Sequence, residues 1–143
     1  MRALLDINVL IALLDAQHVH HGLAGRWLSA EIEHGWASCP LTQNGVVRIM
    51  SQPAYPNPLP AAAVAARLAE AATSGWHAFW PDEISLLDDG ILNWNRVLGS
   101  RQITDCYLLA LAVQRGGRLV TFDHRIAIAA VPGAGHRNLA VIE

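Results

Sequence analysis

Lysine is absent from this chain of 143 residues, so all ten strongly basic side chains are arginines, set against twelve acidic ones. The resulting net charge of −2 gives no overall electrostatic footprint for a nucleic acid. A chain with this net charge that binds nucleic acid must use a local basic surface of its own or a basic surface that a partner supplies. Phosphoaspartate enzymes and receiver domains generally need a lysine to neutralise the phosphoryl oxygens, and its absence counts heavily against both classes.

Cysteine and long apolar runs are also scarce. The two cysteines, Cys39 and Cys106, are predicted to be buried small hydrophobes rather than a disulfide. No apolar run approaches the length of a membrane span, and the first five residues are cut short by Asp6, so we expect no secretory signal and a cytoplasmic protein. A hydrophobic fraction of 52% with 15% charged residues excludes a disordered chain.

Several familiar site patterns are missing or incomplete. There is no phosphate-binding loop, and the segment around Asp6 lacks the glycine-rich turn of a dinucleotide-binding fold. His18, His20 and His21 suggest zinc, but their spacing matches no standard structural site and no paired cysteines accompany them. A solvated link between two helices is the better interpretation of these histidines.

The remaining pattern predicts alternating strands and helices. Short apolar segments are separated by segments with hydrophobic residues at helical spacing, and prolines interrupt them between Pro53 and Pro60. Residues 82–99 are ambiguous, and Thr42 is predicted to cap the helix that follows Pro40. The alternation predicts a single α/β domain over residues 1–143 with a mainly parallel central sheet. Strands are predicted at 3–5, 36–39, 76–80, 118–122 and 139–142, and helices at 8–14, 22–33, 42–50, 61–72, 103–115 and 126–130.

Three aspartates stand where an apolar strand ends or an apolar helix begins. Asp6 and Asp123 each close an apolar run, and Asp105 opens a long one. The carboxyl ends of parallel strands meet at one edge of the sheet, and the start of a crossover helix can reach the same edge. Ionised carboxylates beside apolar surface need a cationic partner, which is an arginine or a divalent metal. If the three converge, Mg²⁺ or Mn²⁺ is the better partner, because both ions prefer oxygen ligands.

Each acid also has an ordinary structural interpretation. Asp6 could cap the helix after it, Asp105 could complement a helix dipole, and Asp123 could be a turn residue. For any one of them alone the structural interpretation is strong, and the conjunction of all three favours a metal site. Such a site polarises a phosphoryl oxygen and generates hydroxide from water, which is what phosphodiester hydrolysis requires.

Arginines and tryptophans could add nucleic-acid contacts. Arg48, Arg101 and Arg125 lie near the proposed metal edge in sequence, where a phosphate contact and an ordinary surface position are equally good interpretations. The five tryptophans are predicted to lie mostly in the core or at an interface, and stacking of one of them on a base is the alternative.

Several of these segments resemble PIN-domain ribonucleases. Leu4–Leu10 resembles the opening motif of that family, and 103–110 followed by 118–123 resembles its closing acidic motifs. Thr42–Ile49 and Trp27–Leu28 resemble the VapC toxin branch, particularly its mycobacterial-type members. The resemblance covers nearly the whole chain in the right order.

The resemblance implies a three-layer α/β/α domain with a Mg²⁺- or Mn²⁺-dependent endoribonuclease site. It implies a toxin that cuts structured RNA such as transfer or ribosomal RNA and stops translation. It further implies a homodimer, silenced by a VapB antitoxin whose tail covers the active groove. By position, Asp6, Asp105 and Asp123 are then the catalytic, metal-binding acids, while Asn8 and Thr121 hold those acids in place.

The sequence departs from the family at one position. A further acid is common on the helix near Thr42, and this chain has Gln43, Asn44 and Gly45 there instead. We therefore predict a one-metal mechanism in which Asp6 and Asp105 ligate the cation and Asp123 completes the site or orients the attacking water. The missing acid also leaves open a catalytically weak or dead module that only binds RNA or an antitoxin. A structure-specific DNA nuclease is a third possibility, because its chemistry would be the same.

Overall fold

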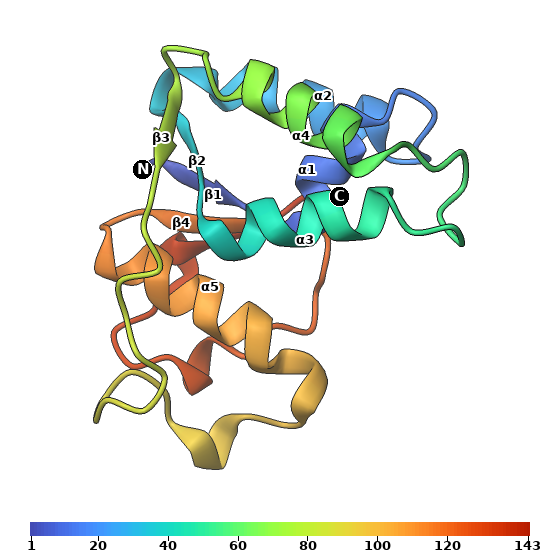
Figure 1. Cartoon of the computed structure of the whole chain (residues 1–143). Helices are drawn as coiled ribbons and strands as arrows, with labels where there is room; N and C mark the ends of the chain where they lie inside the picture. Colours follow the sequence, from blue (N-terminus) through green and yellow to red (C-terminus); the bar gives the residue numbers. More distant parts are fainter.

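Five parallel strands in the order β3-β2-β1-β4-β5 form the centre of the fold (Figure 1). The computed structural model describes residues 1–143. The strands and α-helices are β1 (Ala3–Leu5), α1 (Ile7–Leu14), α2 (His21–Glu31), β2 (Trp36–Ser38), α3 (Pro40–Met50), α4 (Ala61–Ala71), β3 (His77–Phe79), α5 (Ile103–Gln114), β4 (Arg118–Thr121) and β5 (Leu139–Val141). The strongly periodic segments were thus predicted correctly, and so was the parallel sheet.

Alternation along the strands divides the core into two halves. Leu4 and Leu119, which pair across β1 and β4, pack with α5 on one face of the sheet. Leu5 and Val120, one residue further along, pack with α1, α3 and α4 on the other face. Because successive strand residues point to opposite faces, the apolar runs of the sequence are buried on both sides. Figure 1 shows the resulting helix, sheet and helix layers.

The helix ends follow local chemistry. Gly116, at φ 66, ends α5 as predicted, and the Gly117 N–H donates to the Ala112 carbonyl at 2.8 Å, a C-terminal glycine motif. The predicted cap of α3 was wrong. The helix begins at Pro40, because proline is well suited to the first helical position, and Cys39 is the capping residue. The Thr42 hydroxyl instead accepts a bond from the Cys39 N–H at 2.9 Å.

The ambiguous segment at 82–99 is largely irregular and lies along the outer side of α5, with one short 3-10 turn at Trp94–Arg96 (Figure 1).

The tryptophans differ in burial. Trp94 is half-exposed, as is Trp76, whereas Trp36 and Trp80 are buried. Of the five tryptophans, which were predicted to lie mostly in the core or at an interface, Trp36 and Trp80 are part of the core. Both cysteines are buried and free, as predicted. None of the helices combines the length and apolar character needed to cross a bilayer.

Candidate metal and nuclease site

The parallel pairing of β1 with β4 brings Asp6 beside Thr121. The ladder continues one residue past β1, where the Asp6 N–H donates to the Val120 carbonyl at 2.9 Å. Alternation along each strand then directs both side chains to the face that α5 covers, the face already occupied by Leu4 and Leu119. The Thr121 hydroxyl donates to Asp6 Oδ2 at 2.8 Å and accepts from the Asp123 N–H at 3.0 Å. Thr121 therefore joins two of the three predicted acids, the role the resemblance implied for it.

Asp6 is at once a helix cap and a buried acid. Its Oδ1 accepts from the Ile7 N–H at 2.7 Å, which caps α1, and its side chain is only slightly exposed. Burial raises the pKa of Asp6, the bonds from Thr121 and Ile7 oppose that rise, and the charge of Asp123 adds to it. The capping interpretation of Asp6 is thus correct without removing the acid from the site.

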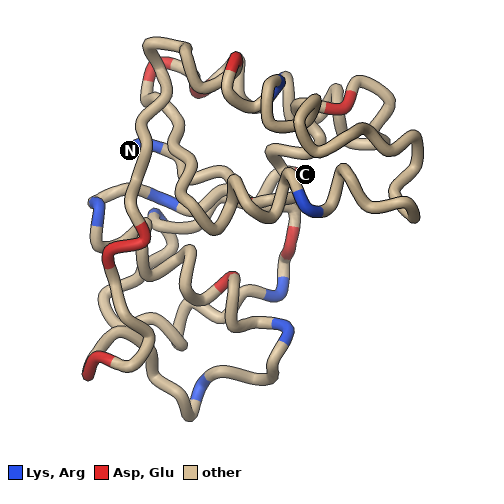
Figure 2. The backbone as a smooth tube through the Cα atoms, in the orientation of Figure 1, with Lys and Arg blue, Asp and Glu red and all other residues tan.

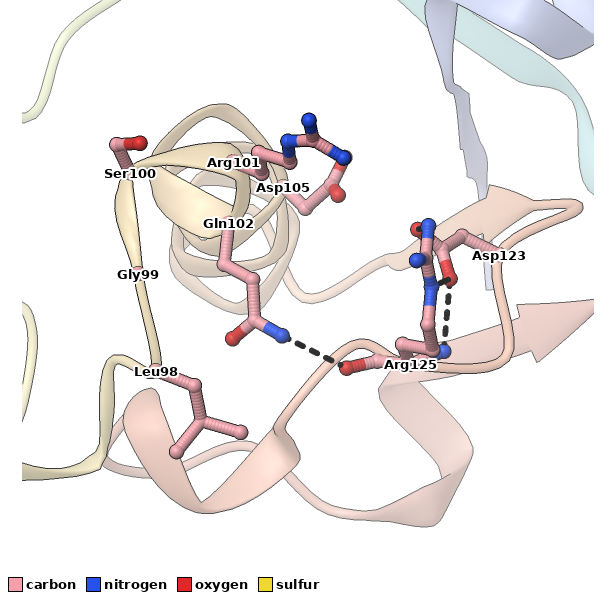
Figure 3. Close-up of a pocket in the computed structure, with 8 residues that line it drawn as sticks. All are labelled: Leu98, Gly99, Ser100, Arg101, Gln102, Asp105, Asp123 and Arg125. Carbon is pink, nitrogen blue, oxygen red and sulfur yellow. Dashed lines mark hydrogen bonds and ion pairs between the residues drawn. The ribbon is translucent and has the colours of Figure 1, made fainter.

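Asp105 lies in the first turn of α5 with no hydrogen-bond or ion-pair partner. Burial, together with the negative charges of Asp6 and Asp123, raises the pKa of Asp105 to about 6, and the charge of Arg125 opposes that rise. The three acids therefore lie close enough to influence one another. Figure 3 shows Asp105 on the helix side of a cavity and Asp123 on the opposite side.

Asp123 has a partner that its sequence position did not indicate. Arg125 Nε donates to Asp123 Oδ1 at 3.0 Å and one terminal nitrogen donates to Oδ2 at 3.2 Å (Figure 3). The Arg125 backbone N–H also donates to Oδ1, at 2.8 Å. These bonds hold the pKa of Asp123 below its usual value. Both carboxylate oxygens of Asp123 are thus in contact with one guanidinium.

Asp105 and Asp123 line an open cavity of about 360 Å³. Its remaining wall is mainly the segment before α5, which the sequence left unassigned, and Gln102 of that segment donates to the Arg125 carbonyl at 3.2 Å. Arg101 and Arg125 line the cavity, whereas Arg48, in the last turn of α3, does not. Figure 2 shows acidic and basic residues close together on this side of the molecule. The lining residues are Leu98, Gly99, Ser100, Arg101, Gln102, Asp105, Asp123 and Arg125.

The amides near the missing helix acid do not take its place in this structure. The Gln43 amide nitrogen donates to Ser38 Oγ at 3.0 Å, and that hydroxyl also contacts His77 Nε2 at 2.8 Å. Asn44 is exposed. Asn8 is exposed too, lies beside Asp123 in a neighbouring cavity, and forms no hydrogen bond to any of the three acids. Its predicted positioning role is therefore not realised, and Thr121 alone bridges two acids.

The chemistry of these donors fits a hard cation, although their present arrangement does not yet form a complete metal site. Asp105 offers a half-buried carboxylate without a partner, and Asp6 retains lone pairs beyond its two hydrogen bonds. No three side chains of the ligand types histidine, cysteine, aspartate and glutamate lie close enough together to hold one ion.

Comparison with known proteins agrees with the fold and the order of the motifs. The family model described as PIN domain matches residues 3–132. Ribonuclease VapC44 of Mycobacterium tuberculosis is 51% identical over 142 residues, which cover 99% of this chain and 100% of that protein. Ribonuclease VapC39 of the same organism is 44% identical over 93% of this chain and 96% of its own length.

Two solved structures have a similar fold at low sequence identity. The sarcin-ricin loop cleaving toxin VapC20 of M. tuberculosis aligns with a TM-score of 0.63 at 15% identity, covering 92% of this chain and 98% of that one. VapBC2 of Rickettsia felis, bound to a DNA fragment from its promoter, aligns with a TM-score of 0.65 at 10% identity over the full length of both chains. The chain belongs to the PIN-domain family and, within that family, to the VapC-type ribonuclease toxins.

Proposed function

We propose that this chain is a Mg²⁺- or Mn²⁺-dependent endoribonuclease, formed by one nuclease domain over residues 1–143 and acting as the toxin of a VapBC-type pair. The observation that carries the proposal is the placement of Asp6, Asp105 and Asp123 at one edge of the sheet, on a chain 51% identical to a VapC ribonuclease. The Thr121 hydroxyl bridges Asp6 and Asp123, and Asp123 lines one cavity with Asp105. The substrate is structured RNA, transfer or ribosomal, whose cleavage stops translation.

The site residues have two proposed roles, which are to bind a cation and to orient the groups around it. Asp6 and Asp105 are the proposed ligands of one divalent cation, and Asp123 completes the site or orients the attacking water. When bound, such a cation stabilises charge on a phosphoryl oxygen and lowers the pKa of water. Thr121 fixes the direction of Asp6 through its 2.8 Å bond.

The partners of the toxin follow from the same family membership. We propose a VapB-type antitoxin whose tail covers the cavity at Asp105 and Asp123, and a homodimer formed through α3 and α4. Ala65 and Ala69 of α4 are exposed beside a cavity shared with α3. Ala65→Arg should yield a monomer in sedimentation velocity, while Ala66→Arg, which is exposed but outside that cavity, should leave the dimer intact.

The direct test is sequencing of RNA ends after induced expression of the wild type and of Asp105→Asn. We expect cleavage at a defined site and growth arrest with the wild type, and neither with the variant. Equal cleavage by both proteins would refute the proposal. A catalytically dead module is the second candidate, favoured by the Gln43–Ser38 bond and by the occupied Asp123. It predicts no acid-dependent binding of Mn²⁺ in calorimetric titration.

A further inference from the structure

Arg125 occupies the carboxylate of Asp123, the group that is proposed to complete the metal site or orient the attacking water. The guanidinium contacts both oxygens of the carboxylate, at 3.0 and 3.2 Å, and the backbone N–H adds a third bond at 2.8 Å. These three bonds use three of the roughly four lone-pair sites of the carboxylate, two of them in the fork with the arginine. A cation that binds Asp123 through both oxygens must therefore displace Arg125.

The competition is electrostatic as well as geometric. A divalent ion beside Asp123 repels a neighbouring guanidinium, so Arg125 becomes free to bind water or another anion when Asp123 ligates the ion. The only other acid of the cavity, Asp105, is a proposed ligand of the same ion and is not available as that anion. The Arg125 side chain is 80% exposed at the mouth of the cavity, where a nucleic-acid backbone can reach it. Its planar fork matches a phosphate as well as a carboxylate.

We propose that Arg125 is a substrate ligand that is stored on Asp123: it holds that carboxylate while RNA is absent and binds an RNA phosphate once Asp123 turns to the cation. The inference rests on the proposed function. It makes Arg125 a positioning residue for Asp123 in the free protein and a phosphate contact in the complex. Metal and RNA then assist each other's binding, because each supplies the partner that the other displaces.

Arg101 provides the matched control. It lines the same cavity and carries the same charge, but it forms no ion pair with Asp123. Arg125→Gln and Arg101→Gln therefore remove equal charge, and only the first removes the forked contact. Arg125→Lys adds a further distinction, because lysine keeps the charge but cannot hold both oxygens in one plane.

The experiment is calorimetric titration of the folded full chain with MnCl₂ alone. We expect Arg125→Gln to bind Mn²⁺ about three- to fivefold more tightly than the wild type, the effect of losing one exposed ion pair. Arg125→Lys should lie between the two, and Arg101→Gln should stay within about twofold of the wild type. An equal gain in both glutamine variants, or no gain at Arg125, would overturn the inference.

Dimethyl phosphate then serves as the probe for the second half of the inference. It should tighten Mn²⁺ binding in the wild type and in Arg101→Gln, and at least half of that tightening should be lost in Arg125→Gln. Unchanged tightening in Arg125→Gln would overturn the transfer to phosphate. If the wild type and Asp105→Asn bind Mn²⁺ equally or not at all, the proposed function itself fails. If instead the wild type binds Mn²⁺ through Asp105 and Arg125→Gln binds it equally well, only the inference about Arg125 fails.

Discussion

At the scale of single residues, the acids differ in how their charge is compensated. Asp123 has a guanidinium, Asp6 has two hydrogen bonds, and Asp105 has neither. An uncompensated carboxylate near two others makes the folded state less stable when it ionises, and it remains available for a cation. Asp105 is therefore the residue at which the stability of the fold and the proposed metal binding are most directly opposed.

Replacing Asp105 by Asn should stabilise the metal-free protein at neutral pH. Because the folded pKa of about 6 exceeds the ordinary value of 3.8, the folded state binds the proton more tightly, and stability is lost as the pH rises through this interval. Asp105→Asn has no such loss. Urea unfolding in EDTA should therefore give the variant an advantage on the order of 2 kcal/mol at pH 7.5 and little advantage near pH 4. An advantage that does not change with pH would contradict the origin given for it.

Thr121→Val should weaken the site and the fold together. The substitution leaves the buried Asp6 Oδ2 and the Asp123 N–H without their shared partner. Leaving such groups unpaired costs about 1–3 kcal/mol in the free energy of unfolding. Thr121→Ser keeps the hydroxyl and is the control in both urea unfolding and RNA cleavage. If serine proves as harmful as valine, the hydroxyl is not what joins the two acids.

The sequence could predict contacts that follow from strand alternation or from the family pattern, but not contacts made in an irregular turn. Strand alternation and the apolar runs predicted the places of Asp6 and Asp123, and the family pattern predicted Thr121. The ion pair of Arg125 could not be predicted, because two residues of separation do not fix the side-chain direction in an irregular turn. The role of Asn8 was mispredicted for a related reason. Side chains in the first turn of a helix point in different directions, and the sequence pattern did not indicate the direction of Asn8.

At the scale of elements, the contact of α1 with α3 positions the first acid. A Cβ at Gly45 would lie 2.4 Å from Ile7 Cδ1 and 2.8 Å from Ile7 Cγ1. Ile7 directly follows Asp6, so the close approach of these helices lies next to the first acid. In the sequence, Gly45 was noted only as part of the stretch that lacks an acid. Its packing against Ile7 joins residues far apart in the chain, so only the structure reveals it.

Gly45→Ala should destabilise the protein although alanine favours helices. Overpacking against Ile7 costs about 1–3 kcal/mol, so through most of that range it outweighs the helix gain of about 1 kcal/mol. Gly25→Ala, in α2 with nothing within 4 Å of the added Cβ, should instead raise the melting temperature. In an Ile7→Ala background the cost of Gly45→Ala should disappear. A cost that persists there would place the strain elsewhere.

Element boundaries were predictable where local chemistry was decisive. Glycines ended α5 at the expected place, and the proline-rich loop separated α3 from α4. Pro40 was taken as the end of a strand, although proline is equally suited to begin a helix, and this ambiguity moved the start of α3. The segment at 82–99 has no strong periodicity, and its conformation depends on contacts with α5 that the sequence pattern does not contain.

At the scale of the whole molecule, the order of the strands creates the site. β1 and β4 are far apart in the chain but adjacent in the sheet, so their carboxyl ends present Asp6 and Asp123 side by side. The alternation of elements predicted a parallel sheet, and the general rule for such sheets predicted the functional edge. It did not predict the cavity wall before α5, because that wall comes from an irregular segment.

We propose that Asp6, Asp105 and Asp123 share one hard cation. Crystals grown with Mn²⁺ and measured at the manganese absorption edge test it most directly. We predict one strong anomalous peak within about 2.5 Å of carboxylate oxygens from at least Asp6 and Asp105, with Asp123 in contact directly or through water. No peak at this edge of the sheet, or a manganese ion bound elsewhere while Asp6 and Asp123 keep their present partners, would contradict the account.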